Sequence, residues 1–321
     1  MSSSIKQTVS EISIQLPWGE IRGRVWGPDD GYPVLCLHGW ADNCGSFNTL
    51  IPLLPKECRY VAIDHAGHGL SSHRPPGVYY CFRLYVADIL KVIDGLKWTK
   101  FTIIGHSMGG NIAGMFSALY PEMVDAIVLL DAAGFLQKDA AEISSVMRKG
   151  IHEMLQYEKK TEQKLRVYTY EKAMERLLAA NPTMPEESVH ILLERGLTAV
   201  EGGFVFSRDL RINLRNVPGT MEQSLEMQSR IQSSVLVIIA DKGLPTFYDS
   251  KQQERISTLL QRYRDRNCGF SGIPLPFYKH RKHQAGTAQI PALCACKESL
   301  RQREKQHKTQ SRAGIKDKKA S

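Results

Sequence analysis

Short, predominantly apolar runs recur along the chain and alternate with longer stretches of helical periodicity. The runs occupy residues 33–37, 60–64, 101–104 and 234–240. Each lacks the polar–apolar alternation of a half-exposed strand, as is typical of strands buried on both faces of a parallel sheet. Within residues 79–98, apolar side chains fall at helical spacing. Strands that alternate with helices predict an α/β protein with a mostly parallel sheet and flanking helices.

A long insertion separates the strand that ends near Asp131 from the one that begins near Val235. Residues 139–160 and 171–197 have the pattern of amphipathic helices, and Asn181-Pro182-Thr183-Met184-Pro185 interrupts the second stretch. A further helix is predicted over residues 250–263. The insertion therefore predicts a helical unit added to the sheet domain.

The apolar run at 101–104 leads into a Gly-x-Ser-x-Gly motif centred on Ser107. The segment reads FTIIGHSMGG, and small residues follow it in a helical stretch. A strand, a tight turn and a helix in this order form a nucleophile elbow, which holds the serine hydroxyl above the sheet. Gly105 and Gly109 are expected where a β-carbon would strike the neighbouring strand or the following helix.

Several sequence blocks around this motif resemble a known family. LCLHGW, AIDHAGHGLSS, GHSMGG and IVLLDAAG resemble the signature blocks of the α/β-hydrolase superfamily. Within it, LPWGEIRGRVWG, LCLHGWADNCGSF and GGFVFSRDLRI resemble the serine hydrolase-like proteins. The resemblance runs from about Trp18 to about Tyr263 and implies an α/β-hydrolase fold with a helical cap. The expected divisions are a core at 1–134, a cap at 135–215, a second core part at 216–263 and a tail at 264–321.

The resemblance also implies roles for individual residues. Ser107 is the expected nucleophile, and the backbone N–H groups of Trp40 and Met108 are the expected oxyanion hole. The histidines His38, His65, His68 and His106 are expected to flank the site and support its loops. The implied reaction is hydrolysis of an ester, thioester or related acyl bond of a small molecule, without a metal or organic cofactor.

The acid and the base of a catalytic triad are harder to place. Asp241 is the better candidate for the acid, Asp131 is the alternative, and either could instead cap a loop. The family places the base histidine after one more short strand. In this chain Gly269, Gly272, Pro274 and Pro276 interrupt that region, because proline cannot donate to a strand ladder and glycine weakens it. We therefore expect the last strand to be missing.

This departure leaves two functions open. The histidines beyond the late strand are His280, His283 and His307, all in basic sequence without a strand pattern. A serine hydroxyl is a poor nucleophile without a base within hydrogen-bonding reach. The alternative to an active hydrolase is thus a catalytically impaired protein of the same fold, whose pocket binds a ligand without turnover.

Charge and composition restrict the remaining possibilities. From Arg262 onward, 15 basic residues stand against four acidic ones, a net charge of +11, whereas the whole chain carries +9. The tail is therefore expected to be disordered, and no motif within it indicates specific nucleic-acid binding.

The chain has no long apolar segment, no signal-peptide pattern and no peroxisomal Ser-Lys-Leu ending, which predicts a cytoplasmic protein. Seven unevenly spaced cysteines predict free thiols, and the oligomeric state stays open.

Overall fold

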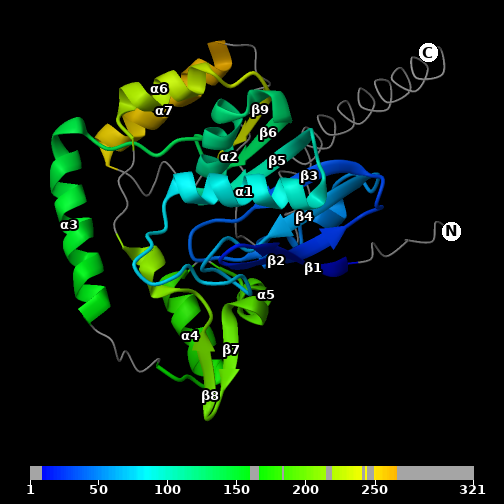
Figure 1. Cartoon of the computed structure of the whole chain (residues 1–321), viewed down its shortest axis with the longest axis vertical. Coiled ribbons are helices and arrows are strands. Elements are labelled where there is room, and N and C mark those ends of the chain that lie inside the picture. The colour runs from blue at the N-terminus through cyan, green and yellow to red at the C-terminus, as the bar shows by residue number, and fades with distance from the viewer. Residues whose placement is uncertain are drawn as a thin grey trace.

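A seven-stranded sheet forms the centre of the molecule in the computed structural model, which describes residues 9–159, 166–182, 184–214, 219–240, 243 and 249–265 (Figure 1). The strand order is β1-β2-β4-β3-β5-β6-β9. The strands are β1 (Val9–Leu16), β2 (Gly19–Trp26), β3 (Tyr32–Leu37), β4 (Cys58–Ile63), β5 (Phe101–His106), β6 (Val124–Leu130) and β9 (Ser234–Ile238). The pairs β1–β2 and β2–β4 are antiparallel, and the pairs from β4 to β9 are parallel.

The parallel part of the sheet is buried on both faces, as the apolar runs predict. Leu35 of β3 lies beside Val61 of β4 and Ile103 of β5, and all three side chains are fully buried. Because side chains alternate across a strand, Leu35 and its neighbour Cys36 belong to separate apolar clusters on opposite faces. Cys36 is fully buried and packs as a small apolar side chain.

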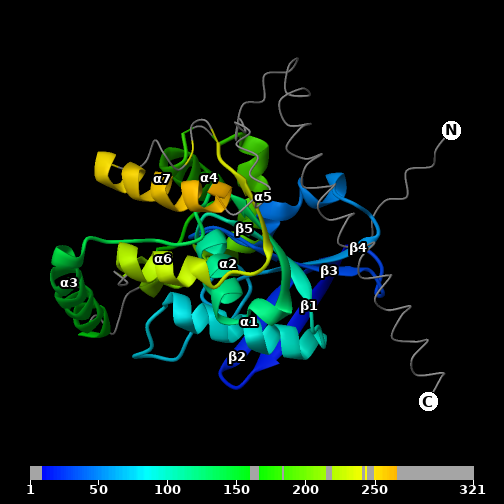
Figure 2. The same ribbon diagram turned by 90° about the horizontal axis from the view of Figure 1, so that it is seen from above.

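Helices cover one face of the sheet, and short 3-10 turns lie against the other. The helices are α1 (Phe82–Leu96), α2 (Met108–Leu119), α6 (Met221–Ser229) and α7 (Ser250–Asp265). Side chains of α1, α2 and α7 share one core cluster with the strands, and Figures 1 and 2 show α1 and α2 side by side. The 3-10 helices η1 (Cys44–Phe47) and η2 (Ile51–Leu53) contribute to the cluster on the opposite face, and η3 (Pro121–Met123) precedes β6.

The insertion between β6 and β9 contains the predicted helices and a hairpin that was not predicted. Its elements are α3 (Ala140–Lys159), α4 (Tyr170–Ala180), α5 (Glu186–Gly196), β7 (Leu197–Val200), β8 (Gly203–Phe206) and η4 (Leu210–Asn213). In Figure 1, α3 stands at the left and the β7–β8 hairpin projects at the bottom. Glu201 and Gly202 form the two-residue hairpin turn, and the φ of Gly202 is 84°.

A buried charge network fastens this insertion to the sheet domain. Arg195, near the end of α5, is 1% exposed and donates to Asp64 Oδ2 through Nε at 3.0 Å and through a terminal nitrogen at 2.8 Å. Its other terminal nitrogen contacts Glu11 of β1 at 2.7 and 2.8 Å. Asp64 follows β4, and its carboxylate also accepts the N–H groups of Cys44 at 2.7 Å and Leu70 at 2.9 Å. The insertion therefore contacts the loops that follow the carboxyl ends of the strands, where open α/β sheets bind ligands.

Three expectations lie outside the described residues. These are the missing last strand, the disorder of the tail from 266 onward, and the placement of Asp241. The boundaries 135 and 215 proposed for the cap stay a prediction. Among the helices that are described, none has the length and apolar character needed to cross a membrane.

Candidate active site

Ser107 occupies a strained turn between the central strand β5 and helix α2. Its backbone has φ 48° and ψ −113°, and it is the N-cap of the helix. A positive φ is uncommon for a residue with a β-carbon and persists only where the surrounding structure imposes it. Here the N–H of Ser107 donates to the carbonyl of Leu130, the last residue of β6, at 3.0 Å. This is the strand–turn–helix geometry that the Gly-x-Ser-x-Gly motif predicts.

The two motif glycines stand where no side chain fits. A β-carbon on Gly109 would lie 2.1 Å from the carbonyl oxygen of Leu37 in β3. One on Gly105 would lie 2.5 Å from the carbonyl oxygen of Gly109, in the first turn of α2. The expected clashes with the neighbouring strand and the following helix are both present, so these glycines allow β5, β3 and α2 to approach closely around Ser107.

Trp40 and Met108 each offer a backbone N–H near the elbow. Met108 is the first residue of α2, so its N–H has no carbonyl partner within the helix. The N–H of Trp40 donates to no other group in the described part of the chain. The indole of Trp40 is 53% exposed and its Nε1 donates to the carbonyl of Ile212 in the insertion at 3.2 Å. Both N–H groups are free to bind a ligand oxygen, and their assignment as an oxyanion hole stays a prediction.

Three buried histidines lie beneath the loop that carries Trp40. The ring centroids of His38 and His65 are 4.5 Å apart, and those of His38 and His68 are 5.1 Å apart. His38 Nε2 accepts the N–H of His65 at 3.0 Å, so its Nδ1 donates to the carbonyl of Gly39 at 2.7 Å. Burial lowers the pKa of His38 and of His68 to about 3, and lowers that of His65 well below its usual value. The cluster is neutral at physiological pH and holds the loops, as the resemblance implies.

His106 and Asp42 form a second polar pair, next to the elbow. His106 directly precedes Ser107, and its Nδ1 lies 3.8 Å from Asp42 Oδ2, with the two side chains 29% and 25% exposed. Burial lowers the pKa of His106 to about 4 and raises that of Asp42 to about 6. At neutral pH the carboxylate is therefore ionised beside an uncharged imidazole. Neither side chain hydrogen-bonds Ser107 within the described residues.

Of the candidate acids and bases, Asp131 lies within the described residues. Asp131 follows β6 with a φ of 49°, its N–H donates to the carbonyl of Ile238 at 2.7 Å, and its carboxylate accepts the N–H of Ala240 at 3.4 Å. A β-carbon on Gly243 would lie 2.2 Å from that carboxylate, so Asp131 is packed against the segment after β9. Asp241, His280, His283 and His307 lie outside the described residues.

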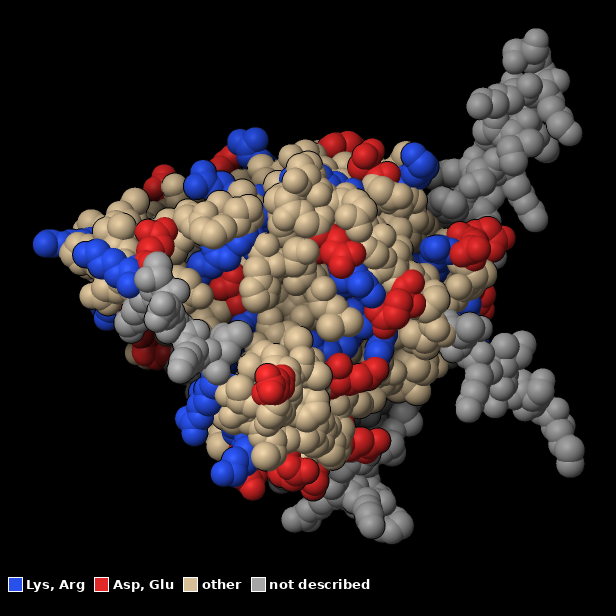
Figure 3. Space-filling view, turned by 60° about the horizontal axis from the view of Figure 1, so that its bottom comes forward, with Lys and Arg blue, Asp and Glu red and all other residues tan. Residues whose placement is uncertain are grey.

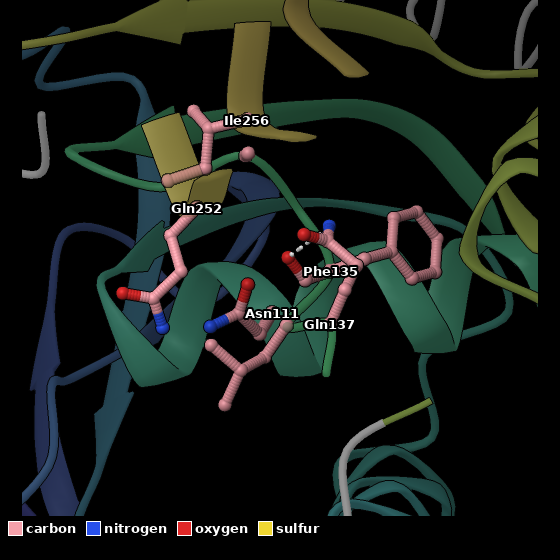
Figure 4. Close-up of a pocket in the computed structure, with 7 residues that line it drawn as sticks. Asn111, Phe135, Gln137, Gln252 and Ile256 are labelled. Carbon is pink, nitrogen blue, oxygen red and sulfur yellow. Dashed lines mark hydrogen bonds between the residues drawn. The ribbon is translucent and has the colours of Figure 1, made fainter. Parts of the chain in front are cut away.

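A shallow pocket lies beside the helix that Ser107 begins. Its empty volume is about 330 Å³, including the part open to solvent, and its lining comes from α2, the segment after β6, and α7. Figure 4 shows the carboxamides of Asn111, Gln137 and Gln252 around it, with Gln137 donating to the carbonyl of Phe135 at 3.0 Å. Asn111 lies one helical turn after Ser107, but Ser107 does not line the pocket. Nowhere in the described ranges do three or more acidic, histidine or cysteine side chains converge as a metal site would require.

Comparisons with known proteins agree with this architecture. The family model of the alpha/beta hydrolase fold matches residues 32–184. Serine hydrolase-like protein of Danio rerio is 53% identical over 270 residues, covering 83% of this chain and 80% of that protein. Serine hydrolase-like protein 2 of Homo sapiens is 42% identical over 255 residues, covering 76% of this chain and 78% of that protein. A crystal structure of a hypothetical protein from Pseudomonas aeruginosa PAO1 superposes with a TM-score of 0.75 at 29% identity, covering 87% of this chain and 95% of that one. The chain therefore belongs to the serine hydrolase-like proteins of the α/β-hydrolase fold.

Proposed function

We propose that this chain hydrolyses an ester, thioester or related acyl bond through an acyl-enzyme formed at Ser107. The observation that carries the proposal is the elbow itself, in which a positive-φ serine starts a helix. Beside it, the N–H groups of Trp40 and Met108 donate to no group among the residues that the structure describes. Strain of this kind costs free energy and persists at functional sites. A structural turn at the same place could be formed by glycine at lower cost.

The proposed reaction has two steps. In the first, Ser107 Oγ attacks the acyl carbonyl carbon, the bond to the leaving alcohol or thiol breaks, and the serine proton passes through a base to that leaving group. The N–H groups of Trp40 and Met108 stabilise the oxyanion of the tetrahedral intermediate. In the second step, water adds to the acyl-enzyme, the acid is released and the proton returns to Ser107.

Proteins of the same fold support an acyl substrate. A crystal structure described as the thioesterase domain from the curacin biosynthetic pathway superposes with a TM-score of 0.67 at 25% identity, over 79% of this chain. The 2-(acetamidomethylene)succinate hydrolase of Mesorhizobium japonicum is 27% identical over 60% of this chain. Both names denote hydrolysis of a carbonyl compound, the chemistry that we propose for Ser107.

A second candidate is a protein that binds an acyl ligand without turnover. It is favoured by one observation: glycines and prolines interrupt the region in which the resemblance places the base histidine. General-base assistance contributes roughly 10²- to 10⁴-fold in rate, so its loss would leave hydrolysis near background despite an intact elbow.

The two candidates differ in the products that they form. An active hydrolase releases alcohol or thiol from a panel of p-nitrophenyl esters and acyl thioesters, and Ser107→Ala lowers the rate by roughly a thousandfold or more. Ser117→Ala is the matched control, because Ser117 lies on the same helix and its hydroxyl donates to the carbonyl of Ala113, within that helix, at 2.8 Å. Equal rates for wild type and Ser107→Ala would refute the hydrolase, and saturable binding of the ester without turnover would support the second candidate.

A further inference from the structure

One cation of the insertion is held rigidly at the loops that surround Ser107. Arg208 follows the β7–β8 hairpin, and its backbone is anchored on both sides. The N–H of Ser207 donates to the carbonyl of Gly196 at 2.9 Å, and the N–H of Asp209 donates to the carbonyl of Gly67, in the loop after β4, at 2.9 Å. The first contact fixes this segment to helix α5, and the second fixes it to the sheet domain.

The guanidinium of Arg208 is partly buried and lacks an ion-pair partner in the described part of the chain. Its Cζ lies 5.8 Å from the centroid of the Phe206 ring, and its Nε is buried and has no hydrogen-bond acceptor among the described residues. Burial lowers the pKa of Arg208, the positive charge of Arg176 lowers it further, and the carboxylate of Asp42 opposes both effects. A desolvated cation with an unused donor costs free energy unless a ligand completes its coordination.

The groups around Arg208 connect it to the candidate active site. Asp42, whose charge acts on Arg208, lies 3.8 Å from the imidazole of His106, the residue before Ser107. A β-carbon on Gly39 would lie 2.9 Å from His106 Nδ1 and 3.2 Å from Asp42 Oδ2, so this pair packs against the loop that carries Trp40. The charge of Arg208 also acts on His68 beneath that loop.

We propose that Arg208 binds a carboxylate of the substrate, on the part of the acyl chain away from the reacting carbonyl. This inference rests on the proposed function and narrows its substrate class to acyl compounds that carry a second, anionic end. A guanidinium presents paired N–H donors that match a carboxylate, and such charge-assisted bonds are stronger than neutral ones.

The local charge balance favours a carboxylate over a phosphate. The carboxylate of Asp42 acts on Arg208, and it repels a doubly charged ligand more strongly than a singly charged one. A carboxylate carries one negative charge, whereas a phosphate monoester carries nearly two at neutral pH. On the face shown in Figure 3, basic and acidic side chains are interspersed, so anion selectivity depends on this local cation and not on a broad positive surface.

The first test compares two substrates that differ only at the far end of the acyl chain. The p-nitrophenyl monoester of adipate carries a carboxylate there, and its ω-amide carries an uncharged group of similar size. We expect wild type to prefer the carboxylate substrate in kcat/KM by roughly ten- to a hundredfold, as a charged hydrogen bond supplies. Arg208→Gln should abolish this preference in kcat/KM, and Arg208→Lys should retain part of it.

A binding measurement separates failure of this inference from failure of the proposed hydrolase. Calorimetry with adipate and adipamide needs no turnover. Arg230→Gln is the control, because Arg230 is an exposed arginine that pairs with Glu226. Adipate binding that Arg208→Gln weakens at least tenfold supports the carboxylate site even if no ester is hydrolysed. Equal binding of adipate and adipamide, no adipate binding, or equal loss in Arg230→Gln overturns it.

Discussion

At the residue scale, the site depends on a few positions where the backbone could not accept an ordinary side chain or conformation. Ser107 has a left-handed φ, and Gly105 and Gly109 fill spaces that hold no β-carbon. The sequence indicates these positions because their residue types and spacing are local. The short distance from Gly109 to β3 follows from the packing of α2 against the sheet. No local sequence pattern indicates this packing.

Gly109→Ala should lower the stability of the protein markedly. The new methyl group would lie 2.1 Å from the carbonyl oxygen of Leu37 and 2.8 Å from that of His38, both backbone atoms that cannot rotate away. We expect a loss of about 2–3 kcal/mol or more in the free energy of unfolding, from overpacking and backbone displacement. Urea titration gives this value from the midpoint and slope.

Gly196→Ala is the matched control for this prediction. Gly196 also lies in a helix, but a β-carbon there would find its nearest neighbour at 3.8 Å. Because alanine favours helix, this variant should change stability by less than about 1 kcal/mol, in the stabilising direction. Equal effects of the two substitutions would show that the close approach around Ser107 is not rigid.

At the scale of elements, the buried Asp64–Arg195 pair joins parts of the chain that are far apart in sequence. Although burial opposes it, the carboxylate of Asp64 raises the pKa of Arg195, which stays charged. One carboxylate thus holds the loop after β3, the loop after β4 and helix α5 together.

Arg195→Met should destabilise the protein because it leaves the Asp64 carboxylate buried without its cation. We expect a loss of about 3–5 kcal/mol in the free energy of unfolding, as is typical when one partner of a buried pair is removed. The control is Arg230→Met, since Arg230 and Glu226 form an exposed pair whose loss costs about 0.5 kcal/mol or less. Denaturant unfolding that shows the same small change in both variants would contradict the fastening role of Arg195.

The elements themselves were largely predictable, and the contacts between them were not. The predicted helices at 79–98, 139–160 and 250–263 correspond to α1, α3 and α7, because their apolar periodicity is strong. The β7–β8 hairpin was missed because its strands have only four residues each, although Glu201-Gly202 is a possible turn signal. Asp64 and Arg195 are 131 residues apart, so only the fold reveals their contact.

At the scale of the whole molecule, buried histidines link stability to pH. The pKa of His68 is about 3 in the folded protein, against 6.5 for an unperturbed histidine. Between these values the unfolded chain binds a proton that the folded protein does not, so stability is lost as pH falls from about 6.5 toward about 3. Each such histidine contributes a slope of about 1.4 kcal/mol per pH unit.

His68→Asn should therefore reduce the pH dependence of stability. Asparagine can keep a donor toward the carbonyl of Ala66, which His68 Nδ1 contacts at 3.0 Å, but it does not titrate. Urea unfolding at pH 6.5, 5.5 and 4.5 should show a slope smaller than that of wild type by about 1.4 kcal/mol per pH unit. Ser117→Ala, a buried substitution without titration, should lower stability by the same amount at each pH. Parallel slopes for wild type and His68→Asn would mean that His68 is protonated in the folded protein.

The central claim is that the elbow makes Ser107 reactive toward acyl-type electrophiles, and fluorophosphonate labelling measures this most directly. The probe phosphonylates a serine oxygen and releases fluoride. Labelling therefore depends both on a reactive serine hydroxyl and on stabilisation of the oxyanion, and it needs no natural substrate. We predict that wild type and Ser117→Ala are labelled at Ser107, identified by peptide mass, and that Ser107→Ala is not. Labelling that persists in Ser107→Ala, or wild type that stays unlabelled at probe concentrations that label an active serine hydrolase, would contradict the account.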